Sequence, residues 1–269
     1  MEETIGRAFG RIPEMNEDYN KIRRKIVETA YNSGEGHIAS SLSIVELLYV
    51  LYNNILTGDD YFILSKGHAS LGLYSTLNHF GYITDEELKT FCKDCTLLPG
   101  HPDRIKLPCV CASTGSLGHG LPIGVGIAMG LKASCKKGNV YVLVGDGEMN
   151  EGSILEAVNL AAYHKLDNLC CIVDCNGSAD RALTTHLPRV FHAFGWMVDE
   201  VSGHNPFDVQ RAAQMGNVLT GAPKCVVAIT VKGCGVSFIE GSPHEWHHKA
   251  LSKEQYLQAM EELKCGNSL

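Results

Sequence analysis

Two short motifs carry the residues of this chain that are best suited to bind a metal ion and a phosphate. The first is Gly145-Asp146-Gly147-Glu148, and Asn176 follows Asp146 by thirty residues in a second motif, Asp174-Cys175-Asn176. One carboxylate and one amide oxygen, with coordination positions left over for phosphate oxygens, suit Mg²⁺ holding a diphosphate. Glycines on both sides of Asp146 let a phosphate approach the backbone, and a helix that follows them offers its amino end.

The residues around these motifs predict a strand, a helix and a second strand. Residues 140–144 and 169–173 are apolar runs typical of buried strands, and residues 153–164 between them have a helical pattern. A strand–helix–strand unit of this length crosses over right-handed and lays its two strands parallel. Asp146 and Asn176 therefore both lie at carboxyl ends of strands, where open α/β sheets bind ligands.

Patterns along the rest of the chain predict an α/β fold, with a mostly parallel sheet and helices on both faces, as a single domain over residues 1–269. Further strands are expected at residues 61–64, 194–201 and 225–231. Helices are expected at residues 20–32, 43–52, 69–80, 121–131, 208–215 and 252–264, with capping boxes at Thr84 and Ser252. The glycine-rich helix at 121–131 should pack closely on the sheet. Residues 97–116 form a long loop, and such loops are usually functional.

Composition excludes several classes of protein. The net charge of −7 provides no basic field for nucleic acid. The acidic start Met1-Glu2-Glu3-Thr4 lacks the apolar core of a signal peptide, and no run approaches the roughly twenty apolar residues of a membrane span. Eleven cysteines without a leader indicate free thiols in a reducing cytoplasm. We therefore expect a cytoplasmic protein that binds neither nucleic acid nor membranes.

Four cysteines raise the question of a zinc site. Cys92 and Cys95 form a C-x2-C pair, and Cys109 and Cys111 form a C-x-C pair. The second pair is too tight for the usual zinc knuckle, and no fold feature supports one. Buried or surface thiols are the interpretation that we favour.

Four of the twelve histidines lie in glycine-bearing or aromatic segments at the ends of predicted elements. These are His37, His68, His101 and His247. A single such histidine is more often structural than catalytic. Four in these settings favour a polar pocket in which imidazoles exchange protons or hydrogen bonds with a ligand.

At this level of detail the chain resembles the amino-terminal, diphosphate-binding half of a transketolase. The GDG motif followed by asparagine after about thirty residues is the signature of thiamine diphosphate binding, and the other motifs follow in the family's order over nearly the whole chain. The matching segments are GEGHIASSLS (34–43), LSKGHA (64–69), GHPD (100–103), TGSLGHG (114–120), GDGEMNEG (145–152), DCNG (174–177), VKGCG (231–235) and WHHK (246–249).

The resemblance implies a thiamine-diphosphate-binding fold, two cofactors and a set of site residues. Asp146, the Asn176 side chain and the Ser178 backbone carbonyl would bind Mg²⁺, or Ca²⁺ or Mn²⁺ in its place. The residues implied to contact thiamine diphosphate are His68, Gly115, Leu117, Gly118, Gly147, Glu148, Asn176 and His247. The residues implied in catalysis are His37, His68, His101, His247 and Glu151.

The histidines would surround the reacting sugar. His37 and His101 are the best candidates for contacting its hydroxyls, and His68 and His247 for proton transfer. In the family the glutamate at the position of Glu151 helps to link the two active sites of a dimer. Glu151 is equally explained as a first-turn carboxylate that interacts with a helix dipole, and the two interpretations are compatible.

The chain departs from the family's pattern in several places. Ser178 replaces a bulkier apolar residue, His119 stands where glutamine is common, and His248 stands where glycine usually follows the last histidine. The last two changes leave the choice of sugar open. Full-length members also continue beyond the position of Leu269 into pyrimidine-binding and carboxy-terminal domains. We expect both to be absent here and supplied by a second polypeptide in an α₂β₂ assembly; a truncated, inactive relative is the alternative.

The reaction that the resemblance implies is transfer of a two-carbon ketol unit from a ketose or ketose phosphate to an aldose or aldose phosphate, with this chain as one subunit of a two-chain enzyme. An α subunit of a 2-oxo acid dehydrogenase also carries the GDG and asparagine motif, but the GHP and WH segments suit sugar hydroxyls better. A cofactor-binding or regulatory protein without catalytic residues is a second alternative. A split enzyme for an unusual or non-phosphorylated sugar is a third.

Overall fold

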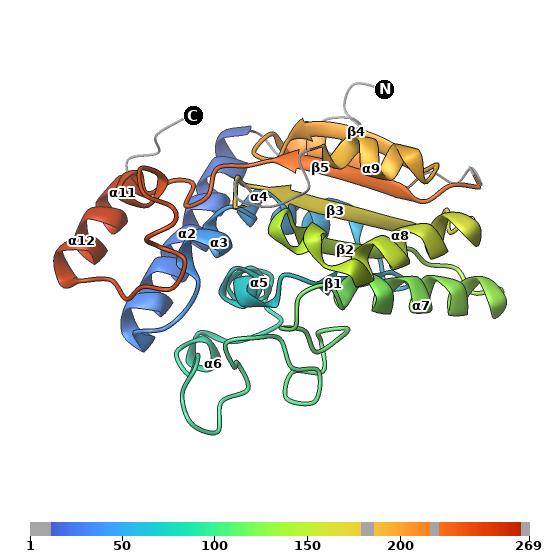
Figure 1. The fold of residues 1–269 in the computed structure, drawn as a ribbon. Helices are drawn as coiled ribbons and strands as arrows, with labels where there is room; N and C mark the ends of the chain where they lie inside the picture. Colours follow the sequence, from blue (N-terminus) through green and yellow to red (C-terminus); the bar gives the residue numbers. More distant parts are fainter. Residues whose placement is uncertain (1–11, 179–185, 216–220, 265–269) are drawn as a thin grey trace, which may run out of the picture.

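The computed structural model describes residues 12–178, 186–215 and 221–264. Five parallel strands form one sheet in the order β1-β2-β3-β5-β4 (Figure 1). The strands are β1 (Tyr61–Leu64), β2 (Val140–Gly145), β3 (Leu169–Cys175), β4 (Met197–Ser202) and β5 (Lys224–Ile229). The predicted parallel α/β sheet is confirmed. Strand β2 is buried at every position, as expected for a strand covered on both faces.

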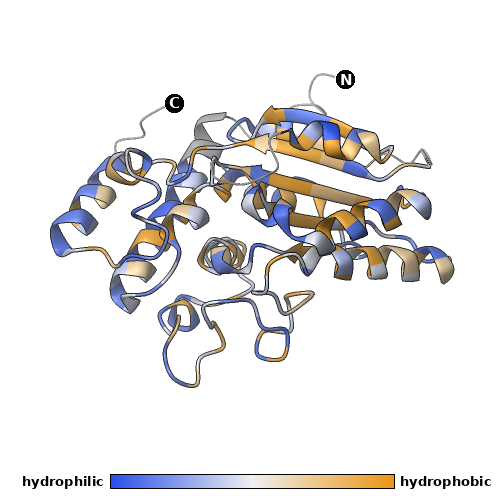
Figure 2. Ribbon diagram, viewed as in Figure 1, coloured by the Kyte–Doolittle hydropathy of each residue, from blue (hydrophilic) through white to orange (hydrophobic). Residues whose placement is uncertain are grey.

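Helices cover both faces of the sheet, as predicted. One face packs against α2 (Ile12–Ser33), α3 (Ile38–Leu42), α4 (Val45–Val50), α5 (Ser70–His79) and α10 (Pro206–Ala213). The other face packs against α7 (Gly120–Ala133), α8 (Gly152–Tyr163) and α9 (Leu187–Ala193). The strands are coloured mainly as hydrophobic in Figure 2, whereas the outer helices alternate between hydrophobic and hydrophilic residues. The adjacent Cys170 and Cys171 belong to opposite cores, because alternate strand residues face opposite sides.

Short elements complete the described chain. They are η1 (Leu51–Ile55, a π turn), η2 (Gly67–Ala69), α6 (Asp85–Leu88), η3 (Gly147–Asn150), α11 (Ser237–Glu240) and α12 (Lys253–Glu262). Both predicted capping boxes are present, at Thr84 with Glu87 and at Ser252 with Gln255. Helix α12 lies against α2, where the rings of Tyr31 and Tyr256 stack with centroids 4.3 Å apart.

The predicted close packing of α7 on the sheet is confirmed. A Cβ atom at Gly124 would lie 2.5 Å from Val142 Cγ2, so only glycine permits this approach. Residues 97–116 form an irregular loop, also as predicted. Buried groups hold it in place: Tyr74 Oη donates to the Pro99 carbonyl at 3.0 Å, and Ser70 Oγ donates to the Gly100 carbonyl at 2.7 Å. These bonds fix the backbone immediately before His101.

The structure corrects the bounds of several predicted elements. The helix expected at 20–32 begins at Ile12, and the strand expected at 225–231 spans Lys224–Ile229. The helix expected at 43–52 begins at Val45 and continues into the π turn, because Ser43 ends α3 and turns its hydroxyl toward buried partners. The strand expected from residue 194 begins at Met197, because Phe194 and Gly195 close α9, with Gly195 at φ +81°. No helix of the described segments combines the length and apolarity needed to cross a membrane.

Candidate functional site

The two predicted metal-binding side chains directly follow neighbouring strands, at the carboxyl edge of the sheet. Gly145 of β2 pairs with Asp174 of β3, and the Asp146 N–H donates to the Asp174 carbonyl at 3.1 Å. Asp146 is 2% exposed, and its carboxylate accepts the Gly147 N–H at 2.7 Å. The register therefore brings Asp146 beside the residues that follow β3, including Asn176.

Asp174, a buried carboxylate, orients the Asn176 amide. Asn176 Nδ2 donates to Asp174 Oδ2 at 2.8 Å, so its oxygen Oδ1 faces the other way and accepts the Ser178 N–H at 3.1 Å and the Ser178 hydroxyl at 2.6 Å. Asp174 is fully buried and forms an ion pair with the equally buried Lys66. Ser43 and Thr230 also donate to its carboxylate.

The groups at this edge fit a divalent cation with a diphosphate. Carboxylate, amide and backbone carbonyl oxygens from Asp146, Asn176 and Ser178 are the hard ligands that Mg²⁺ and Ca²⁺ prefer. A Cβ atom at Gly147 would meet no atom within 4 Å, so the backbone there faces open space. Space beside backbone N–H groups is what a phosphate requires.

Two lysines beside this edge were not assigned a role from the sequence. Lys66 follows β1, and Lys232, which follows β5, donates to Ser178 Oγ at 3.0 Å. Burial and the nearby Lys66 lower the pKa of Lys232. The sequence did contain a signal for these lysines. Both lie in glycine-bearing motifs at the carboxyl ends of strands, where a cationic side chain would meet an anionic ligand.

Glu148 holds together the loop that was predicted to contact the cofactor. Its Oε1 accepts the Gly118 N–H at 2.8 Å and the Ser65 hydroxyl, and its Oε2 accepts the Gly145 N–H at 3.2 Å. Burial raises the pKa of Glu148. A Cβ atom at Gly118 would lie 2.5 Å from Ser153 Oγ, so this approach requires glycine. Glu148 is therefore a buried side chain that positions the loop by accepting hydrogen bonds.

The four predicted histidines come together from four separate segments. The His37 ring lies 5.2 Å from His68, 5.0 Å from His247 and 6.4 Å from His101, measured between centroids. His68 and His247 are 5.6 Å apart. Histidines up to 210 positions apart in the sequence therefore form one cluster. We call it the histidine pocket, and its members are His37, His68, His101 and His247.

Burial keeps the inner histidines neutral at neutral pH. It lowers the pKa of His68 to about 2, assisted by the Lys66 charge, and the pKa of His37 to about 4, assisted by His247. The pKa of His247 is also lowered, mainly by burial. Neutral imidazoles can each donate one hydrogen bond and accept another, which suits a polyhydroxyl ligand.

The remaining predicted residues lie at the rim of the site. Leu117 and His119 are exposed, and His119 Nδ1 lies 3.0 Å from the Leu117 carbonyl. A Cβ atom at Gly115 would meet the His101 ring at 3.1 Å, which places this glycine against the pocket. Glu151 is exposed at the start of α8, next to Gly118.

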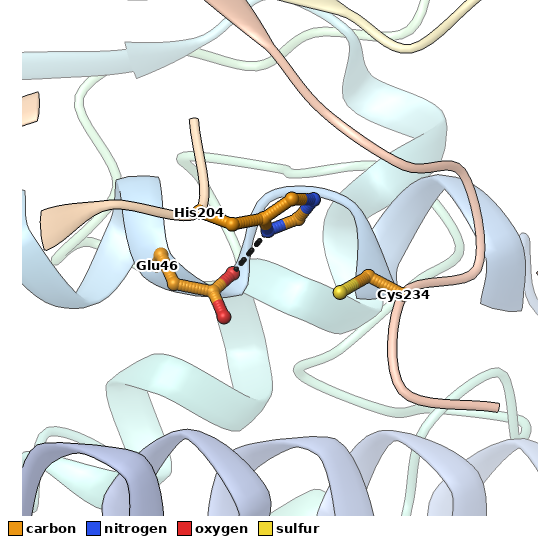
Figure 3. Close-up of side chains that lie close together, drawn as sticks. All are labelled: Glu46, His204 and Cys234. Carbon is orange, nitrogen blue, oxygen red and sulfur yellow. Dashed lines mark hydrogen bonds and ion pairs between the residues drawn. The ribbon is translucent and has the colours of Figure 1, made fainter. Parts of the chain in front are cut away.

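The four cysteines considered for zinc are free thiols. Burial raises the pKa of Cys92, Cys109 and Cys111, which favours the protonated form over the thiolate that zinc requires. Within residues 12–178, 186–215 and 221–264, one group of three side chains does place metal-ligand atoms within 4.8 Å of one another: Glu46, His204 and Cys234 (Figure 3).

This buried group is better explained as an ion-pair network. Arg23 pairs with Glu46 and donates to the Cys234 carbonyl at 3.0 Å, so a guanidinium already supplies the positive charge. His204 Nδ1 lies 3.0 Å from Glu46 Oε2, and its Nε2 accepts the Val231 N–H at 2.8 Å. Both ring nitrogens are therefore engaged. The network joins α2 and α4 to the loops that follow β4 and β5.

Comparison with known proteins identifies relatives over almost the entire chain. The family described as transketolase, thiamine diphosphate binding domain, matches residues 15–266. One apulose-4-phosphate transketolase subunit of Actinobacillus succinogenes is 42% identical over 93% of this chain and 96% of that protein. The 6-deoxy-6-sulfo-D-fructose transketolase subunit SqwG of Clostridium sp. is 32% identical over 93% of this chain and 96% of that protein.

Full-length enzymes match along part of their length. Human transketolase is 32% identical over 94% of this chain but only 42% of that protein. The crystal structure of Campylobacter jejuni transketolase superimposes with a TM-score of 0.85 at 29% identity, covering 95% of this chain and 43% of that one. The chain thus spans about two fifths of the full-length transketolases that it matches.

Proposed function

The chain belongs to the transketolase family through its thiamine diphosphate-binding domain, and we propose that it is the diphosphate-binding subunit of a two-chain transketolase. The observation that carries this proposal is that the two lysines at the sheet edge also act on the histidine pocket. Lys66 pairs with Asp174, and Lys232 donates to Ser178 Oγ. Burial and the charges of both lysines lower the pKa of His247. Two relatives that are named as subunits of apulose-4-phosphate transketolases match this chain over nearly their full length, which supports the two-chain arrangement.

In this proposal the sheet edge binds the cofactor. Asp146, the Asn176 side chain and the Ser178 carbonyl hold Mg²⁺, for which Ca²⁺ or Mn²⁺ can substitute, and the metal holds the diphosphate. Backbone and side chains that line the cofactor are His68, Gly115, Leu117, Gly118, Gly147 and His247, with Glu148 behind them. When bound, thiamine diphosphate supplies a nucleophilic carbon and an electron sink for cleavage next to a ketose carbonyl.

The histidines divide the remaining work according to their burial. His68 and His37, whose pKa values lie far below neutrality, stay uncharged and hydrogen-bond the sugar. His101, which is exposed at the pocket, contacts a further hydroxyl. His247 is more exposed than His68 and is the better candidate to accept or return a hydroxyl proton, because burial disfavours its charged form less.

A second polypeptide is required in this proposal. It carries the pyrimidine-binding and carboxy-terminal domains, and the simplest assembly is an α₂β₂ heterotetramer with the active sites between subunits. Glu151 is exposed at the start of α8 and is therefore accessible for a link between two sites.

The substrate that we propose is a ketose phosphate, or a similar ketose with an anionic end, acting as donor to an aldose. Two relatives of similar length carry the names of specialised sugars, apulose 4-phosphate and 6-deoxy-6-sulfo-D-fructose. This favours a specialised sugar over the general pair of xylulose 5-phosphate and ribose 5-phosphate, and both belong in the test.

The decisive experiment measures ketol transfer in the presence of thiamine diphosphate and Mg²⁺. The chain is assayed alone and with the product of a neighbouring gene that encodes the pyrimidine-binding half. Donors are apulose 4-phosphate, 6-deoxy-6-sulfo-D-fructose and xylulose 5-phosphate, with pyruvate to detect 2-oxo acid activity. Transfer in the mixture alone supports the proposal. Turnover of pyruvate and of no ketose would overturn it in favour of a 2-oxo acid enzyme.

A further inference from the structure

A carboxylate–imidazole pair lies on the outer side of the histidine pocket. His248 Nε2 is 3.1 Å from Glu35 Oε2, and the His248 ring lies 4.9 Å from the His37 ring. Both side chains are about half exposed, at 52% for Glu35 and 56% for His248. The His248 ring therefore continues the histidine pocket beyond His37, on the side that faces solvent.

Folding stability does not account for this pair. Exposed ion pairs contribute little to stability because solvent screens them. The two residues are 213 positions apart, and other contacts hold their segments. Buried Trp246 anchors one segment, with Lys249 Nζ 4.8 Å from its ring centroid. In the other segment, the Glu35 N–H donates to Ser33 Oγ at 3.2 Å.

Each partner also presents an unused polar atom. Among the described residues, neither Glu35 Oε1 nor His248 Nδ1 has a hydrogen-bond partner. A carboxylate oxygen accepts a hydrogen bond from a hydroxyl, and the second ring nitrogen can engage a neighbouring hydroxyl. Two such atoms side by side match two adjacent hydroxyl groups of a sugar. The negative charge of Glu35 disfavours a phosphate or sulfonate at the same place.

We propose that Glu35 and His248 form a specificity-determining pair that binds adjacent, uncharged hydroxyl groups of the sugar, remote from its reacting carbonyl. This inference rests on the proposed function, since the histidine pocket is taken to surround the reacting end. The pair lies one ring beyond His37 and so meets the outer carbons of a longer sugar. Short aldehydes, which end before those carbons, do not reach it.

The test uses the assembled enzyme with one active donor and four acceptors of increasing length: glycolaldehyde, glyceraldehyde, erythrose and ribose. Glu35→Gln, His248→Gly and the double variant are compared with Glu245→Gln, which alters an exposed carboxylate of the same segment. Thiamine diphosphate binding and thermal unfolding are measured to verify that each variant is folded. We expect kcat/KM for erythrose and ribose to fall about tenfold, through KM, as for loss of a hydrogen bond to a charged group.

The same variants should keep kcat/KM for glycolaldehyde within about twofold of the wild type. For erythrose and ribose, the double variant should lose no more kcat/KM than the more impaired single variant, because the two residues act as one unit. An equal loss for every acceptor would mean that the variants disturb His37, and would overturn the inference, as would unchanged ratios between acceptors. A wild-type enzyme that transfers to no acceptor would instead overturn the proposed function, and this inference with it.

Discussion

At the scale of single residues, Asp146 and Asp174 have different proposed tasks, although both are buried. Asp146 is the proposed metal ligand, whereas Asp174 supports the site through Lys66, Ser43, Thr230 and the Asn176 amide. A single change at Asp146 therefore tests the metal site without removing the pair that supports it.

Asp146→Ala should abolish Mg²⁺-dependent binding of thiamine diphosphate, because it removes the one carboxylate among the proposed ligands. Titration calorimetry with and without Mg²⁺ measures the effect. Asp208→Ala, which removes a partly exposed carboxylate of α10 paired with Arg211, is the control and should bind normally. Cofactor binding by Asp146→Ala at wild-type affinity would refute the metal assignment.

The depressed pKa of His68 predicts how the apoprotein responds to acid. The unfolded chain takes up a proton near pH 6.5, whereas folded His68 stays neutral down to about pH 2. Below pH 6.5 the unfolded state therefore binds more protons, and stability falls by about 1.4 kcal/mol per pH unit from this residue.

Urea unfolding of the apoprotein at pH 7.5 and pH 5.5 checks this. The wild type should lose about 1.4 kcal/mol more between the two values than His68→Gln, which has no titrating ring. His164→Gln, which removes an exposed histidine at the end of α8, should lose as much as the wild type. Identical losses for His68→Gln and the wild type would show that His68 titrates normally in the folded protein.

At the scale of elements, Glu148 joins three segments: the end of β1, the loop before α7 and the end of β2. Glu148→Gln replaces one carboxylate oxygen with an NH₂ group. In one orientation this group faces the Ser65 hydroxyl and the Gly118 N–H, and in the other it faces the Gly145 N–H, so a donor always meets a donor. A buried mismatch of this kind costs about 1–3 kcal/mol. The loop should loosen, and affinity for thiamine diphosphate should fall about tenfold or more.

Fluorescence titration of the cofactor compares Glu148→Gln with Glu156→Gln, which changes an exposed residue of α8. Wild-type affinity in Glu148→Gln would mean that the loop does not depend on this carboxylate. A lower unfolding temperature with unchanged cofactor affinity would confine Glu148 to a structural role.

Local patterns predicted the elements whose signals are strong and contiguous. Apolar runs identified β2 and β3. Helix α9 was missed because it has seven residues, although Pro188 near its start is a helix-start signal. Helix α3 was missed, and α4 was predicted to begin two residues too early, at Ser43. Ser43 instead ends α3 and bonds Asp174, 131 positions later.

The candidate site was predictable to the extent that its residues lie in motifs. The histidines and the GDG segment are recognisable by their glycine neighbours and spacing. The Lys66–Asp174 pair and the Arg23 network join residues 108 and 211 positions apart, and nothing local in the sequence indicates such pairing. Glu35 and His248 are a third case, visible only once the two segments lie side by side.

At the scale of the whole molecule, the Lys66–Asp174 pair couples the site to global stability. Lys66→Met leaves the Asp174 carboxylate buried without its counter-ion, which costs about 3–5 kcal/mol, a large share of the roughly 5–15 kcal/mol that stabilises a typical protein. Denaturant unfolding should register this loss. Lys25→Met, which breaks the partly exposed pair with Asp85, should cost at most about 1 kcal/mol.

The double variant Lys66→Met with Asp174→Asn removes both charges and should recover part of the stability, because neither ion is then left unpaired. If Lys66→Met loses no more unfolding free energy than Lys25→Met does, the buried Lys66–Asp174 pair does not contribute to stability in the way that its burial indicates.

The packing of α12 on α2 has a consequence for the timing of events at the site. The stacked rings of Tyr31 and Tyr256 and the bond from Arg24 Nη1 to the Leu263 carbonyl, at 3.1 Å, hold the last helix of the described chain against the first. The segment that carries His247 and His248 lies between α11 and α12. Partial detachment of α12 would loosen the chain that follows this segment, while β2 and β3, which lead to Asp146 and Asn176, stay paired. The opening of α12 and the opening of the sheet thus have separate free energies, and amide hydrogen exchange in α12 should be faster than in β2 and β3.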